Sequence, residues 1–206
     1  RFLFREEARP SASDLSKVYP LDDFALANRL SYFLWSSLPD EALWQKAKSG
    51  TLRGNLEKEV RRMVADPKTD AFIANFTGQW LQLRDLEMSN PDRRRFPTFT
   101  DDLRSAMRKE TEHFFGYLLR ENRPVSEFLT ADYTFSNQKL ANYYKFEGKF
   151  ENIFKKVSLS GVNREQRGGL LSHSSILTIT SNPTRTSPVK RGRWVLDNLL
   201  GAPPKE

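Results

Sequence analysis

The sequence contains no cysteine and only two histidines among its 206 residues. The absence of cysteine excludes disulfides, thiolate metal sites and cysteine nucleophiles within the chain. It also excludes the Cys-x-x-Cys-His signature of covalent haem attachment. We therefore expect the chain itself to hold no haem and no essential metal.

Other familiar signatures are missing too. No apolar run approaches the ~20 residues of a membrane-spanning helix, so no membrane span is expected. The chain has no P-loop, no G-x-G-x-x-G, no zinc signature and no G-x-S-x-G elbow. It begins RFLFREE, without a methionine or a signal peptide, so we interpret it as part of a longer protein.

Hydrophobic residues make up 38% of the chain, and aromatic residues are plentiful, with 15 Phe, 6 Tyr and 4 Trp. This composition and length are sufficient for a globular core. The formal net charge is +7, but basic and acidic residues are mixed along most of the predicted helices. We expect a solvated surface of mixed sign and only weak, salt-sensitive binding to DNA, so we do not expect nucleic acid as a partner.

Helical periodicity dominates the pattern. Five predicted helices cover residues 23–37, 39–50, 56–66, 69–86 and 100–122. Weaker patterns predict extended segments at 131–135 and 153–159, and a helix from residue 163 through two glycines to about residue 176. The predicted fold is mainly α: a helical bundle of about four long helices followed by a smaller, irregular, helix-rich part.

The longest predicted helix ends before Pro124, and the pattern changes there. We therefore predict two domains. Residues 1–124 form the helical bundle. Residues 125–206 form a smaller C-terminal domain packed on it, which ends in a helix and a Pro-rich linker.

The C-terminal segment 178–201 has the strongest local signals. Ser187 is a predicted N-cap followed by proline at the first helical position, and Gly201 is a predicted stop. Four cations lie around the start of this helix: Arg185, Lys190, Arg191 and Arg193. Because a helix N-terminus is itself positive, we expect an anionic partner for them, which a buried carboxylate, a bound anion or another protein would supply.

Glu110 is the predicted buried carboxylate. It lies between Met107 and Phe114 on the apolar stripe of the 100–122 helix. A charge at such a position needs a partner, because an unpaired buried charge is very costly. We predict a bond to Arg185 or Arg191, with Arg29 as another candidate.

The two histidines, His113 and His173, are secondary candidates for a functional site. Glu110 and His113 form a Glu-x-x-His pair of the kind used in di-iron bundles, but those bundles need two such pairs and further carboxylates. We therefore predict a packed or rim position for His113 and no metal site. His173 lies among serines, which suggests a nucleophile pair, although neighbours in sequence rarely form a catalytic triad.

Several long segments together resemble a known family. They are LANRLSYFLWSSLPD, GQWLQLRDLE, FPTFTDDLRSAMRKETEHFF, LTADYTFSNQKLANYY and RGGLLSHSSILTITSNPTRTSPVKRGRWVLDNLLGAPP. They look like the adjoining uncharacterised domains of large planctomycete and verrucomicrobial proteins. The resemblance implies an exported or periplasmic protein of several domains, commonly with a cytochrome c-type haem module elsewhere in it.

The resemblance implies a structural or interaction region of a cytochrome c-linked protein, whose partners are the other domains or subunits of that assembly. Any haem would be in a neighbouring domain or subunit. Two other classes stay open. One is part of an enzyme acting on polysaccharide or in redox chemistry beside a haem. The other is anion or nucleic-acid binding through the cationic loop 181–193.

Overall fold

The computed structural model describes residues 20–204, with the side chain of residue 162 excepted, and the prediction of a mainly α fold is confirmed. The α-helices are α1 (Asp23–Trp35), α2 (Glu41–Lys48), α3 (Leu56–Ala65), α4 (Asp70–Trp80), α5 (Asp101–Arg120), α6 (Glu127–Thr130), α7 (Gln138–Tyr144), α8 (Gly161–Gln166), α9 (Ser174–Ile179) and α10 (Pro188–Trp194). Short helical turns are η2 (Arg53–Asn55), η3 (Pro67–Thr69), η4 (Leu83–Leu86), η5 (Leu170–Ser172) and the π-helical η6 (Val195–Leu199). The strands are β1 (Tyr133–Ser136) and β2 (Lys155–Ser158). No helix within the described residues is both long and apolar enough to cross a membrane.

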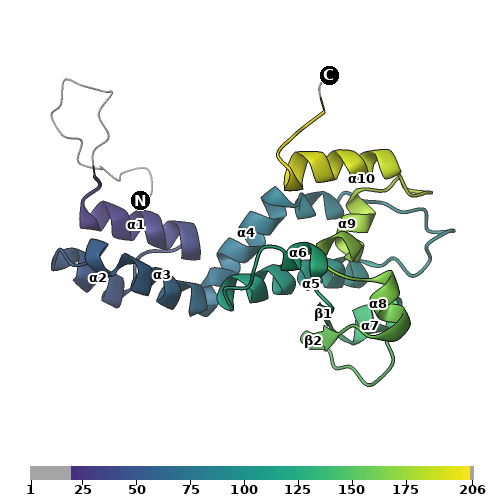
Figure 1. Ribbon diagram of the computed structural model, residues 1–206, viewed down its shortest axis with the longest axis horizontal. Coiled ribbons are helices and arrows are strands. Elements are labelled where there is room, and N and C mark those ends of the chain that lie inside the picture. Colours follow the sequence, from purple (N-terminus) through teal and green to yellow (C-terminus); the bar gives the residue numbers. More distant parts are fainter. Residues whose placement is uncertain (1–19, 205–206) are drawn as a thin grey trace. The chain divides into compact units, whose positions relative to one another are not determined.

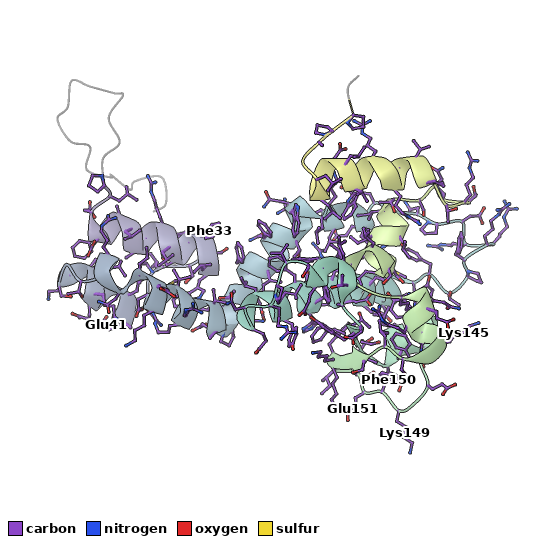
Figure 2. All side chains as sticks on the ribbon, viewed as in Figure 1. Phe33, Glu41, Lys145, Lys149, Phe150 and Glu151 are labelled. Carbon is purple, nitrogen blue, oxygen red and sulfur yellow. The ribbon has the colours of Figure 1, made fainter. Side chains whose placement is uncertain are left out.

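The chain divides into two compact units, residues 1–72 and 73–206. In the first unit, the Asp22 side chain caps α1 by accepting from the Ala25 N–H at 2.7 Å, and Asp40 caps α2 from Leu43 at 3.0 Å. Figure 2 labels Phe33 on α1 and Glu41 at the start of α2. The buried core of this unit is Ala27, Leu34, Trp35, Leu43, Ala47, Leu52 and Met63.

An ion-pair network lies along this first core. Arg62 contacts Asp40 at 2.7 Å and the nearly fully buried Glu59 at 2.9 Å, while Lys46 reaches Glu59 at 2.5 Å. The guanidinium also lies over the Trp35 ring, 5.6 Å from its centroid. The Glu59 charge is therefore shared by two cations, as a buried carboxylate requires.

Helix α5 is the central element of the second unit (Figure 1). Thr100 caps it by accepting from the Leu103 N–H at 3.2 Å. Its buried face contacts β1, α7 and α9, which are close to α5 although they are distant in sequence. Strands β1 and β2 pair antiparallel, with Tyr133 opposite Ser158.

The core of the second unit joins residues from both sides of the predicted boundary at residue 124. Its buried members are Leu81, Leu83, Phe114, Leu118, Ala131, Tyr133, Leu170, Ile176 and Trp194. A further buried cluster comprises Leu86, Leu103, Ala106, Met107, Leu140 and Tyr144. Thus α5 and the C-terminal segments share one hydrophobic interior.

The C-terminal helix is anchored by two tryptophans. Trp194 in α10 is buried and donates to the Leu81 carbonyl at 3.4 Å. Trp80 donates in return to the Asn198 carbonyl in η6, at 2.6 Å. Ser187 caps α10 as predicted, with Pro188 next, but the last turn widens to a π-helix before Gly201.

The predicted helix 163–176 is wrong. Helix α8 ends at Gln166, and the chain passes through two non-helical glycines before η5 and α9. Gly169 has φ 61° and ψ −178°, a conformation restricted essentially to glycine. A Cβ there would be 2.6 Å from the Phe128 carbonyl oxygen and 2.7 Å from that of Leu129. Close backbone contact, together with this conformation, therefore interrupts the helix.

We predict that Gly169→Ala destabilises the protein by about 2–5 kcal/mol, because it adds backbone strain and a clash with two carbonyl groups. The matched control is Gly192→Ala in α10, where a Cβ would meet nothing within 4 Å. Alanine favours helix there and should stabilise by up to ~1 kcal/mol. Urea unfolding of both variants measures the difference. Equal effects would contradict the proposed role of Gly169.

Candidate functional site

Glu110 is buried, with 1% of its surface exposed, as its place on the apolar stripe predicts. The Thr134 hydroxyl in β1 donates to its Oε1 at 2.6 Å, and the Tyr144 hydroxyl at the end of α7 donates to its Oε2 at 2.5 Å. Burial raises the pKa of the Glu110 carboxyl to about 7, although both hydrogen bonds and the Arg167 charge oppose the rise.

Tyr144 links this carboxyl to the first residue of α9 and to the segment that precedes this helix. Its hydroxyl accepts from the backbone N–H of Ser174 at 3.0 Å. The Arg167 guanidinium lies over the Tyr144 ring, 3.6 Å from its centroid, and its Nη1 lies 3.5 Å from the Ser172 carbonyl oxygen. Stacking therefore fixes the position of a cation close to a buried acid.

A second buried network lies alongside. The Thr111 hydroxyl hydrogen-bonds His173 Nδ1 at 3.0 Å and the Ser175 hydroxyl at 2.7 Å. The His173 ring is edge-on to Phe114, and its Nε2 has no hydrogen-bond partner among the described residues. Burial, and secondarily the Arg167 charge, lowers the pKa of His173 to about 3, so the imidazole is neutral. Ser175 is fully buried and bonds Thr111, so the described geometry contains no exposed Ser–His nucleophile pair.

The loop before α10 is a closed turn. Asn182 N–H donates to the Arg185 carbonyl at 2.9 Å, and Ser181 pairs with Thr186 in an isolated bridge. Two bonds from the 87–99 loop anchor this turn. The Asp92 N–H donates to the carbonyl of residue 183 at 2.9 Å, and Arg95 donates to that of residue 184 at 3.0 Å.

These two loops and α9 surround a pocket of about 410 Å³. Its lining residues are Pro91, Phe96, Thr98, Phe99, Tyr143, Arg167, Ser174, Leu177, Thr178, Ser181, Asn182, Arg185 and Thr186. One part of the lining is aromatic, and the other supplies hydroxyls, an amide and two guanidinium groups. The described lining includes no carboxylate. Such a pocket has the chemistry to bind an anionic group attached to an apolar or polyhydroxylated body.

The predicted bond between Glu110 and Arg185 or Arg191 is wrong. The hydroxyls of Thr134 and Tyr144 donate hydrogen bonds to the two carboxylate oxygens. The cation whose charge acts on the Glu110 pKa is Arg167. The physical reason is that burial raises the carboxyl pKa, so hydroxyl donors can satisfy a group that is readily protonated.

The four C-terminal cations have separate environments. Arg185 lines the pocket, and Arg191 Nε lies 3.4 Å from the Thr180 hydroxyl. Arg193 pairs with Asp197 at 3.4 Å, while Lys190 is exposed.

The remaining predicted residues lie outside the pocket. Arg29 is an exposed residue of α1 in the first unit. His113 is exposed and stacks on Phe154, with ring centroids 4.9 Å apart. Within residues 20–204 no cluster of three or more metal-ligating side chains is present.

Sequence analysis missed Arg167, Tyr144 and Thr134. Tyr144 follows another tyrosine and Arg167 precedes two glycines, but neither position has a periodic or motif signal. Only the packing of β1 and α7 against α5 brings Thr134 and Tyr144 to Glu110, and Arg167 comes close by stacking on the Tyr144 ring.

Comparison with protein families identifies the two parts of this site. Residues 21–146 match PSD4, described as a protein of unknown function (DUF1592). The chain belongs to the PSD4 family. Its residues 167–206 match PSCyt3, described as a protein of unknown function (DUF1588). These are adjoining uncharacterised domains whose names indicate planctomycete, cytochrome c-associated families, so the resemblance seen in the sequence is confirmed.

Searches of curated proteins and of solved structures gave no match. The pocket nevertheless joins the two family segments. Residues 91–143 of its lining fall in the PSD4 match, and residues 167–186 fall in the PSCyt3 match. The PSCyt3 segment thus completes a site that the PSD4 segment begins.

We predict that Glu110→Gln changes the pH dependence of stability. The folded pKa of about 7 exceeds the ordinary 4.5, so the carboxyl stabilises the fold below pH 4.5, and this stabilisation is lost as pH rises through 7. Glutamine does not titrate. Urea unfolding at pH 5 and pH 8 should show the variant gaining about 2–3 kcal/mol relative to the wild type at the higher pH.

Comparing the wild type with Glu110→Gln at each pH separates the contribution of Glu110 to the free energy of unfolding from that of His173. The folded pKa of His173 is depressed, so its contribution has the opposite sign: it is present above pH 6.5 and lost as pH falls. That contribution is common to both proteins and cancels. A pH-independent difference between them would contradict the raised pKa.

Proposed function

We propose that this chain is a recognition region of an exported, cytochrome c-linked multidomain protein, and that its pocket binds the anionic group of a small molecule. The observation that supports the proposal is the pair of guanidinium groups, Arg167 and Arg185, in one pocket. Neither has a carboxylate within 4 Å among the described residues. Guanidinium groups bind carboxylate, phosphate and sulfate through paired, charge-assisted hydrogen bonds.

The Arg167 side chain is preorganised, and the backbone that carries the exposed Arg185 side chain is held in place. Arg167 is stacked on Tyr144, whose own hydroxyl is bonded on one side to Glu110 and on the other to Ser174. Arg185 lies on the closed turn that the 87–99 loop anchors. Side chains that are held before the ligand arrives lose less entropy on binding, which favours affinity.

The pocket lining also weighs against carboxylate-dependent glycoside hydrolysis at this site. That chemistry needs two carboxyl groups about 5–9.5 Å apart. The described lining has none, and the nearby Glu110 is buried behind Tyr144. A binding role is therefore the better supported one, with the cytochrome-linked neighbours as the partners that would use it.

We predict saturable binding of inorganic sulfate, inorganic phosphate and acetate in a low-chloride buffer. Arg185→Met and Arg167→Met should each weaken it by about tenfold to a hundredfold, because each removes charged hydrogen bonds. Isothermal titration calorimetry and the arginine Nε resonances in NMR measure the binding. Arg193→Met is the control, since Arg193 is 72% exposed and pairs with Asp197 outside the pocket. If no anion binds, or if Arg193→Met weakens binding as much as the others, the proposal is wrong.

A further inference from the structure

A second pocket adjoins the first. It has a volume of about 680 Å³ and is lined by Thr98, Thr100, Leu103, Gln138, Lys139, Asn142, Tyr143, Lys145 and Asn152. Thr98 and Tyr143 line both pockets. The two hollows therefore border each other at these residues. We call them together the groove: the two arginines line its first half, and α7 and the loop after it line its second half.

The second half of the groove is dominated by amides. Gln138, Asn142 and Asn152 each offer donors and an acceptor, and Thr98 and Thr100 offer hydroxyls. Gln138 Nε2 already donates to the Asn142 Oδ1 at 2.8 Å, which holds the two amides side by side on α7. Groups that both donate and accept are suited to alcohol hydroxyls, which also do both.

Aromatic side chains line the first pocket together with the arginines, and one of them, Tyr143, also lines the pocket that holds the amides. Tyr143 is 42% exposed and Phe96 is 43% exposed, and Phe99 lines the same part of the groove. Exposed rings beside hydrogen-bonding groups provide flat apolar surfaces for the C–H face of a sugar ring.

The charge is uneven along the groove. Arg167 and Arg185 face the first pocket without a described carboxylate partner, whereas Lys139 in the second pocket is paired with Asp102 at 2.5 Å. Lys145 lies at the end of α7 and is a further cation of the second pocket (Figure 2). An acidic group at one end and hydroxyls along the body are therefore the ligand features that this groove matches.

We propose that the groove binds an acidic oligosaccharide, with one carboxylate or sulfate between Arg167 and Arg185 and the following sugar rings along Tyr143 and the α7 amides. This inference rests on the proposed anion-binding function and extends it to a ligand class. An acidic peptide is the competing ligand. Neither β1 nor β2 lines the two pockets, so the described groove offers no edge of these strands to which a peptide could pair.

The test uses the 206-residue chain and galacturonate oligomers of one to four units, with maltotriose as a neutral probe and triglutamate as an acidic peptide. Calorimetry should show affinity rising at least tenfold from monomer to trimer, with maltotriose binding at least tenfold more weakly than the acidic trimer. Asn142→Ala should remove most of the gain with length and leave the monomer affinity within about twofold, because Asn142 lines only the second pocket.

Lys145→Met and Lys149→Met form a matched pair. Both residues, labelled in Figure 2, are exposed and close in sequence, but of the two only Lys145 lines the groove. Only Lys145→Met should weaken trimer binding. If the monomer binds at the arginines but length adds nothing, the oligosaccharide inference is wrong while anion binding stands. If triglutamate binds as tightly as the acidic trimer, the ligand class is wrong. If no anionic probe binds, both proposals fail.

Discussion

The structure of the second unit depends on the burial of one carboxyl group. Glu110 lies on the buried, apolar face of α5. An ionised group without partners there would carry a prohibitive desolvation cost. Hydroxyl groups from β1 and α7 donate hydrogen bonds to this carboxyl. The α7 hydroxyl, that of Tyr144, also accepts a hydrogen bond from the Ser174 N–H at the start of α9. Three elements, β1, α7 and α9, are thereby fixed around a single acid of α5.

This arrangement also positions the candidate site. The ring that donates to Glu110 on one side is the surface on which Arg167 stacks, so the acid network supports the cation of the pocket. Because the pKa of Glu110 is about 7, the charge behind Arg167 changes near neutral pH. The Arg167 guanidinium therefore lies beside a group whose charge depends on pH, and it opposes the rise of the Glu110 pKa.

The PSD4 and PSCyt3 segments are separate family matches, yet the protein core does not separate them. Phe114 and Leu118 of the first pack with Leu170, Ile176 and Trp194 of the second. The pocket follows the same junction. The boundary between the two sequence families therefore runs through one hydrophobic core to which both segments contribute.

The sequence by itself determined most of the helices, because caps and 3.6-residue periodicity are local: α1 and α5 lie within the predicted ranges 23–37 and 100–122, and Ser187 caps α10 as predicted. It also determined that Glu110 is buried, because helical spacing places this residue between Met107 and Phe114 on the apolar stripe of α5. Which groups meet Glu110 was decided only by the tertiary structure. Long-range packing selected Thr134 and Tyr144 over arginines, and it broke the predicted 163–176 helix, because Gly169 must pass against the Phe128 carbonyl. Contacts across 24 or 34 residues leave no periodic trace in a single sequence.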